Sequence, residues 1–174
     1  QLEIPVEAAA RALAVSKMRN LTTVLNPAPA QALSAELLAT VDILTPNQSE
    51  ARILLGLAAD DPRSDEDVAV ALLDLGVGQV VMTLGAEGAL IAGKDGIARV
   101  KSYPVPVVDT TGAGDAFNGA LAAGLSEGLS LIDAVRRGTA AGALAVTKPL
   151  VVPALPDSAQ IAALTQTGRY IDAG

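Results

Sequence analysis

The sequence predicts a three-layer α/β fold in which helices flank a mostly parallel sheet. Short runs of Val, Ile and Leu alternate with helical patterns of about ten to fifteen residues, the order expected when crossover helices join parallel strands. Apolar types make up 51% of the 174 residues and charged types 18%, a composition that suits a sizeable core and argues against disorder. We therefore expect a single α/β domain over residues 1–174.

The strands are predicted where β-branched or apolar residues run together between turn signals. Three such runs occupy residues 21–25, 41–44 and 79–83. Two more, 89–92 and 97–101, flank Gly93-Lys-Asp-Gly96 and predict a β-hairpin, the one antiparallel interruption. Residues 105–108 are expected to be extended.

The helices are predicted where apolar residues recur at helical spacing behind a capping residue. Their expected spans are 5–19, 34–40, 45–56, 64–75, 115–125, 130–146 and 157–165. In the third span Thr45 is expected to cap the helix, with Pro46 in the first turn and Gln48 closing a capping box. That arrangement leaves Asn47 and Glu50 without a capping role.

The composition excludes several classes of site. The chain has no Cys and no His, so disulfides, zinc sites with nitrogen or sulfur ligands, thiol nucleophiles and His-based triads are excluded within it. A general base is then expected to be a carboxylate, with Tyr and Lys as outside alternatives. A net charge of −7 argues against a nucleic-acid binder, and 2% aromatic residues leave few platforms for stacking.

We expect no contact with membranes and a cytoplasmic location. No apolar run approaches the roughly 18–20 residues of a membrane span, and no signal peptide is visible. The chain opens at Gln1 close against a helical pattern, which suggests a fragment.

The stretch from Asp109 to Gly119, DTTGAGDAFNG, carries the strongest chemical signal. Its glycines stand between a strand end and a helix start, where backbone N–H groups and the helix dipole form an anion site. Asp115 at the helix start is suited to act as base for a hydroxyl that attacks a phosphate. The alternative is a tight turn with an ordinary first-turn acid. Phe117 stands where a dinucleotide fingerprint needs its third Gly.

Two further motifs are open to a structural and a functional interpretation. Asn47 and Glu50 lie three residues apart on one helix face, where an amide and a carboxylate can hold Mg²⁺ waters and phosphate oxygens. The alternative is a helix start that is simply polar. Thr83-Leu-Gly-Ala-Glu-Gly88 follows a strand, and its glycines either let the backbone approach a ligand or form a turn into the hairpin.

Together these strings resemble the ribokinase-like sugar kinases of the phosphofructokinase B family. Asp109–Asp115 resembles the C-terminal signature of the family, Thr45–Glu50 its Asn-x-x-Glu motif, and Val81–Gly88 its nucleotide loop. Gln1–Pro5 and Asn26–Pro29 are most similar to the ribokinase branch. The resemblance covers Gln1 to about Pro156. It implies a ribokinase-like fold and that this chain corresponds to a C-terminal half, with the sugar-binding strands, Gly-Gly motif and lid missing.

The resemblance implies a role for each matching residue in ATP-dependent phosphorylation of a sugar, most naturally D-ribose. Asp115 would be the catalytic base and contact the sugar, Glu3 would reach the sugar, and Gly112, Ala113 and Gly114 would supply the anion hole. The residues that would bind ATP are Asn47, Thr83, Gly85, Gly88, Gly114 and Thr139. Glu50 would act on Mg²⁺ through water. A homodimer is implied for the full-length enzyme.

A monovalent cation, K⁺, would lie beside the anion hole, where the resemblance implies a ligand set from two segments: Asp109, Thr111, Ala145, Lys148, Leu150 and Ala154. The sequence departs from the family here. Leu150 stands where Gly is expected and Ala154 where Ser is expected. Carbonyl ligands survive such changes but a hydroxyl ligand does not, so the potassium site is the weakest part of the assignment.

The sequence leaves two alternatives to a ribose kinase. One is a kinase for another sugar or a nucleoside, because the sugar-selecting residues lie mostly outside this chain. The other is a nucleotide-binding remnant without catalysis, and the fragment alone is expected to be inactive.

Overall fold

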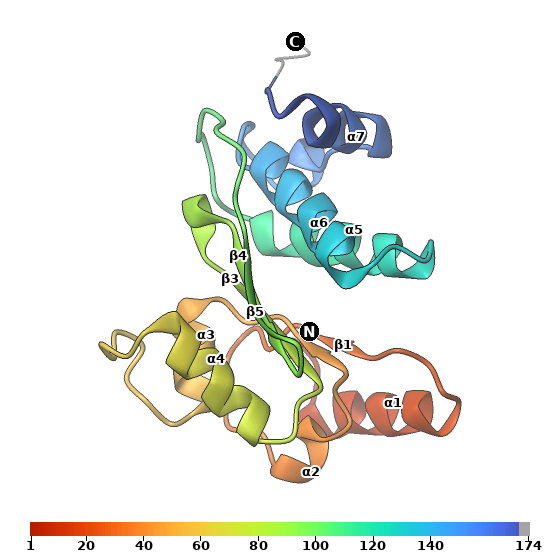
Figure 1. Ribbon diagram of the computed structural model, residues 1–174. Helices are drawn as coiled ribbons and strands as arrows, with labels where there is room; N and C mark the ends of the chain where they lie inside the picture. The colour runs from red at the N-terminus through yellow and green to blue at the C-terminus, as the bar shows by residue number, and fades with distance from the viewer. Residues whose placement is uncertain (171–174) are drawn as a thin grey trace. The chain divides into compact units, whose positions relative to one another are not determined.

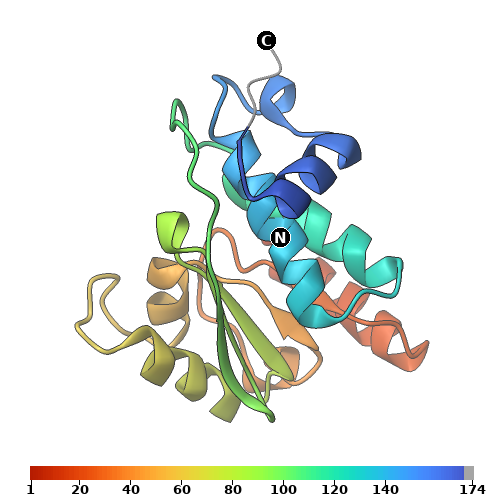
Figure 2. The same ribbon diagram turned by 45° about the horizontal axis from the view of Figure 1, so that its top comes forward.

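The computed structural model describes residues 1–170, which form seven α-helices, two 3₁₀ helices and five strands (Figures 1 and 2). The described chain divides into two compact units. Unit 1 comprises residues 1–84 and 90–99, and unit 2 comprises residues 85–89 and those from 100 onward. The expectation of one domain over residues 1–174 stays a prediction. No described helix is long and apolar enough to cross a bilayer.

Unit 1 contains a five-stranded sheet in the order β1-β2-β3-β4-β5. Its strands are β1 (Val24–Leu25), β2 (Ile43–Leu44), β3 (Gln79–Thr83), β4 (Ala89–Gly93) and β5 (Gly96–Val100). The first three are parallel, with Val24 opposite Ile43 and Leu44 opposite Val80. Two residues join the neighbouring strands β4 and β5, a connection that only an antiparallel pair allows. The predicted hairpin is confirmed, and β1 and β2 are shorter than expected.

Four helices of unit 1 pack on one face of this sheet. They are α1 (Val6–Met18), α2 (Ala35–Leu38), α3 (Gln48–Leu54) and α4 (Asp65–Asp74). Leu13, Leu38 and Leu72 from the helices share one apolar cluster with Val80 and Met82 of β3. Val81 is also buried but points to the opposite face, since side chains alternate along a strand. The central strand β3 is thus buried on both faces, as its apolar, non-alternating sequence predicts, whereas β5 is largely exposed.

Unit 2 is helical, with α5 (Ala113–Ser126), α6 (Leu131–Ala145) and α7 (Ser158–Thr167), and the 3₁₀ helices η1 (Gly85–Glu87) and η2 (Val152–Ala154). Glycines let α5 and α6 approach closely. A Cβ placed on Gly138 would lie 3.0 Å from the Phe117 carbonyl oxygen, and one on Gly142 would lie 3.3 Å from that of Ala113. These contacts account for the Ala- and Gly-rich composition of both helices.

Candidate active site

The third helix begins differently from the sequence prediction. Asn47, not Thr45, is the N-cap of α3, and Glu50, not Gln48, closes the capping box. The Asn47 side-chain oxygen accepts a 2.8 Å hydrogen bond from the Glu50 N–H, and the Glu50 Oε2 accepts one of 2.8 Å from the Asn47 N–H. Thr45 is buried, and its N–H donates to the Leu25 carbonyl at 2.9 Å, so strand pairing removes it from the cap.

Asn47 and Thr83, both predicted to contact the nucleotide, lie side by side in unit 1. They form an isolated parallel bridge, and the Thr83 N–H donates to the Pro46 carbonyl at 2.9 Å. Asn47 follows β2 and Thr83 is the last residue of β3, so the bridge lies at the carboxyl ends of these two parallel strands. This edge of an α/β sheet is where ligands bind in such folds.

The position of Glu50 changes the pKa of its carboxyl group. Partial burial raises the pKa of the Glu50 carboxyl, and the hydrogen bond from the Asn47 N–H opposes that shift only in part. A cation beside a carboxylate favours its charged form, so an approaching cation would lower this pKa again. Among residues 1–170 no three acidic side chains gather into a metal-binding cluster, so Glu50 would serve a cation through water or with substrate oxygens.

The loop from Gly85 to Gly88 belongs to unit 2, and its two glycines are required for different reasons. Gly88 has φ of +102°, and a Cβ there would lie 2.0 Å from the Val100 carbonyl oxygen. Gly85 has φ of +56°, but a Cβ there would meet no atom within 4 Å. Gly88 is therefore fixed by packing against the chain, whereas the space around Gly85 is open to a ligand.

The glycine-rich motif forms the N-terminus of α5. Gly112 is the N-cap in the left-handed conformation with φ of +81°, and no side chain caps the helix there. Side chains of Ser34, Asn47, Ser64, Ser130 and Asp157 cap five other helices in the described chain, whereas α1 also lacks a side-chain cap but begins after Pro5 and not in a glycine-rich turn. The first N–H groups of a helix have no partner within it, so the α5 terminus presents donors to an anion, although the Ala113 N–H also donates to the Thr110 carbonyl at 3.3 Å. Asp115 is exposed in this first turn.

Asp109 organises the turn that precedes this helix. It accepts hydrogen bonds from the Thr111 N–H at 2.9 Å and from the Thr111 hydroxyl at 2.7 Å. These bonds, with a weaker contribution from the Leu150 N–H, hold the pKa of the Asp109 carboxyl below its ordinary value. Asp109 therefore remains an anion over a wide pH range, which suits a cation ligand.

The second segment of the predicted cation site lies alongside the first. The Val146 carbonyl accepts hydrogen bonds from the N–H groups of Val108 at 2.8 Å and Asp109 at 3.3 Å. Leu150 has φ of +70°, the left-handed conformation that Gly adopts without strain. The resemblance implies Gly at this position, and a left-handed backbone is a physical reason for it. This chain has the left-handed backbone with a leucine in place of glycine. Ala145 and Ala154 are buried and Lys148 is half-buried.

Two predicted residues take other positions. Thr139 is buried in the interior of α6, and its hydroxyl donates to the Val135 carbonyl at 2.8 Å. Only its methyl group is then left for an apolar contact, and a role near adenine stays a prediction. Glu3 is exposed in unit 1 just before α1. Its contact with a sugar also stays a prediction.

Arg52, which no sequence motif indicated, holds the α3 region in shape. Arg52 is 8% exposed, and its guanidinium donates five hydrogen bonds, to the carbonyls of Gln48, Asp61 and Arg63 and twice to Asp65 Oδ1. All five donors of the side chain are used. Asp61, Arg63 and Asp65 lie nine to thirteen residues after Arg52 and follow no helical or strand spacing. The sequence therefore does not indicate these contacts, which form only in the folded loop.

Comparison with known proteins identifies the family. Residues 1–158 match the pfkB family of carbohydrate kinases. A ribokinase of Haemophilus influenzae is 42% identical over 156 residues, which are 90% of this chain and 51% of that protein. The chain spans about half the length of the curated relatives it matches.

Solved structures agree with this match and confirm the predicted fold. Ribokinase from Thermotoga maritima has 36% sequence identity and a TM-score of 0.81, over 90% of this chain and 52% of its own. Arabidopsis thaliana ribokinase complexed with ribose and ATP has 29% identity and a TM-score of 0.87, over 94% of this chain and 54% of its own. The family match and the order of the motifs lead to one conclusion: the chain belongs to the pfkB family of carbohydrate kinases.

Proposed function

We propose that the protein to which this chain belongs transfers the γ-phosphoryl group of ATP to the primary hydroxyl of a sugar, with D-ribose as acceptor and ribose 5-phosphate as product. The observation that carries the proposal is the uncapped N-terminus of α5 with a carboxylate in its first turn. The similarity to ribokinases supports ribose as the acceptor.

The proposed transfer step uses a carboxylate and backbone N–H groups, which this chain contains, while the sugar-binding strands belong to the part of the protein outside it. The sugar oxygen forms a bond to the γ-phosphorus, the bond from that phosphorus to the bridging oxygen of ADP breaks, and the hydroxyl proton passes to the Asp115 carboxylate. Backbone N–H groups of Gly112, Ala113 and Gly114 stabilise the charge on the transferring oxygens. Because phosphoryl transfer has a loose transition state, positioning and charge stabilisation suffice, and no histidine is required.

The remaining residues position ATP and its counterions in this proposal. Asn47, Thr83, Gly85 and Gly88 line the nucleotide, and Thr139 lies near the adenine. Mg²⁺, when bound, neutralises the phosphate charge, and the Glu50 carboxylate holds its water shell. The ionised Asp109 and carbonyls of residues 111, 145, 148, 150 and 154 fit a K⁺ ion, although Ala154 offers no hydroxyl. From the resemblance alone we propose a homodimer.

The experiment is an acceptor survey with the complete protein. ADP release is followed in a coupled assay with ATP, Mg²⁺ and, in turn, D-ribose, deoxyribose, fructose 6-phosphate, adenosine or no acceptor. We expect ADP release to require an acceptor and kcat/KM to be highest with D-ribose. A higher kcat/KM with another acceptor would mean that this compound, and not ribose, is the preferred substrate. The absence of acceptor-dependent release with every compound, while ATP still binds, would favour the non-catalytic remnant.

A further inference from the structure

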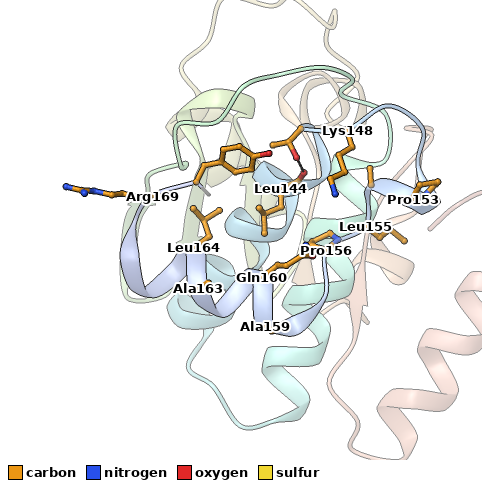
Figure 3. Close-up of a pocket in the computed structure, with 13 residues that line it drawn as sticks. Leu144, Lys148, Pro153, Leu155, Pro156, Ala159, Gln160, Ala163, Leu164 and Arg169 are labelled. Atoms are coloured by element: carbon orange, nitrogen blue, oxygen red, sulfur yellow. Dashed lines mark hydrogen bonds between the residues drawn. The ribbon is translucent and has the colours of Figure 1, made fainter. Parts of the chain in front are cut away.

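Unit 2 contains a cavity that is lined by none of the residues proposed to bind ATP or the sugar. A cavity of about 380 Å³ opens beside the C-terminal end of α6, between residues 147–156 and α7 (Figure 3). Its volume falls in the range of small-molecule sites. None of the residues proposed to bind ATP or the sugar lines it, but Lys148 and Ala154, from the proposed cation loop, do.

The lining combines an apolar floor with positive charge. Leu144, Ala154 and Leu164 supply apolar surface, and the two charged lining residues, Lys148 and Arg169, are both basic. Among residues 1–170 no carboxylate lines the cavity, although the whole chain has 19 acidic and 12 basic residues. In Figure 3 the Arg169 side chain points away from the cavity, whereas Lys148 lies among the residues that surround it.

The hydrogen bonds of the polar lining residues show which donors are available. The Thr147 hydroxyl donates to the Leu144 carbonyl at 2.7 Å, so it is already used as a donor. The Gln160 Oε1 accepts a 2.9 Å hydrogen bond from the Asp157 N–H, which turns the donor end of the amide to other partners. Within residues 1–170 no ion pair engages the half-buried Lys148. Tyr170 also lines the cavity, and its phenol is a further O–H donor. One ammonium group with two neutral donors, an amide and a phenol, in a largely apolar cavity matches a single carboxylate.

We propose that this cavity binds a small monocarboxylic acid with an apolar body. The carboxylate pairs with the Lys148 ammonium and accepts a hydrogen bond from the Gln160 amide. The hydrocarbon part lies against Leu144 and Leu164. A phosphate dianion fits less well, because only one ammonium group faces it and the apolar floor would remain uncovered.

The same loop also connects this cavity to the proposed catalytic turn. Thr147, Lys148 and residues 153–156 line the cavity on one side. On their other side Val151 packs against Gly112, where an added Cβ would lie 2.6 Å from Val151 Cγ1. The Ala154 N–H donates to the Val151 carbonyl at 3.1 Å, which links the two sides in one turn. An acid in the cavity therefore biases the position of Gly112, and this part of the proposal rests on the proposed function.

Binding is tested without any activity assay. Titration of the ¹⁵N-labelled 174-residue chain with hexanoate should give saturable amide shifts in residues 147–155 and at Gly112. 1-Hexanol, hexylamine and inorganic phosphate should bind at least tenfold more weakly. Equal binding of hexanol would overturn the carboxylate assignment. Saturation by phosphate in the same residues would show an anion site of another class.

Two variants test the residues. Lys148→Met keeps the length of the side chain and should weaken hexanoate binding tenfold or more, whereas Lys94→Met, in the β4–β5 turn, should not change it. Ala163→Phe fills the cavity from α7 and should also remove binding. This second variant keeps the test valid if Lys148→Met folds poorly. Unchanged affinity in Ala163→Phe would place the ligand elsewhere and contradict the proposal.

The coupling is tested in the complete enzyme. Hexanoate should change the KM for ATP or kcat at least twofold in the parent enzyme and leave Ala163→Phe unaffected. If hexanoate binds and shifts residues 147–155 but neither Gly112 nor the kinetics respond, the coupling is overturned and the binding site stands. If the protein proves to have no kinase activity, the amide shift of Gly112 still reports the coupling.

Discussion

Asn47 and Glu50 exchange two hydrogen bonds of 2.8 Å, each side chain accepting from the backbone N–H of the other. The two residues that would bind nucleotide and Mg²⁺ are thus also the two that start α3. A capping box stabilises a helix N-terminus by itself, so the motif has a structural use whether or not a ligand binds. Substitutions that keep the cap but change the side chain separate the two roles.

Asn47→Ser should distinguish the cap from the nucleotide contact. Serine caps a helix about as well as asparagine, so the melting temperature should stay near that of the parent. The shorter side chain cannot reach the nucleotide, and the KM for ATP should rise about tenfold. Asn47→Ala, the matched control, should lose about 1 kcal/mol of stability as well. A serine variant with parental ATP kinetics would leave Asn47 as a cap alone.

Glu50→Gln should raise the Mg²⁺ requirement and lower turnover, since it removes one negative charge near the metal. Glutamine still closes a capping box, so the helix start is kept. An Mg²⁺ titration of the coupled reaction measures the effect. If the Mg²⁺ titration curve of the variant matched that of the parent enzyme, Glu50 would have only a structural role.

The raised pKa of Glu50 predicts that the stability of the parent protein depends on pH, and the Glu50→Gln variant tests this. Because burial raises the pKa of Glu50 above its ordinary 4.5, the folded state binds this proton more tightly than the unfolded state. The stabilisation is present below pH 4.5 and is lost as the pH rises through the folded-state pKa. The free energy of unfolding of Glu50→Gln, relative to the parent, should therefore increase between pH 4 and pH 7. Urea denaturation at both pH values measures it, and a relative decrease would contradict the raised pKa.

Asp115→Asn should abolish sugar phosphorylation in the complete enzyme while ATP binding survives. Loss of a general base costs about 10²–10⁴-fold in rate, and the anion hole is built from backbone groups that the substitution leaves in place. Asp133→Asn is a matched control, because Asp133 holds the corresponding first-turn position of α6. More than about a tenth of the parental activity in Asp115→Asn would mean that another group takes the proton.

Gly88→Ala and Gly85→Ala should have unequal effects on stability. An alanine at position 88 would place its Cβ 2.0 Å from the Val100 carbonyl oxygen, and the backbone cannot yield that far. We expect a loss of more than about 2 kcal/mol from this overpacking. Position 85 is open, so Gly85→Ala should lose only about 1 kcal/mol from its positive φ. Equal melting temperatures for the two variants would contradict the packing at Gly88.

Leu150→Gly should stabilise the chain. The left-handed conformation costs a residue with a Cβ about 1–2 kcal/mol, and the entropy cost of glycine offsets about half of that. The leucine side chain is 67% exposed, so its removal forfeits little burial. Leu150→Ala keeps the strained backbone and should show no gain. Chemical denaturation of the two variants gives the comparison, and an alanine variant as stable as the glycine variant would argue against strain at this residue.

Local patterns in the sequence determined most of the secondary structure. Ser34, Ser64 and Ser130 cap the helices that they were expected to cap, because a hydroxyl that reaches an N–H three residues ahead is a local interaction. The hairpin around residues 93–96 was predicted for the same reason. The family and the residues 109–115 were recognised from motifs that are contiguous in the chain.

Contacts between distant segments were decided only by the tertiary structure. Pairing with Leu25 buried Thr45 and moved the start of α3 to Asn47. Leu150 adopts a positive φ in the folded loop, a backbone conformation that no local sequence pattern indicates for a leucine. Capping and periodicity act within four residues, whereas the pairing of strands and the approach of loops depend on the whole core. For that physical reason the sequence named the candidate residues, and the fold determined which of them share a hydrogen bond.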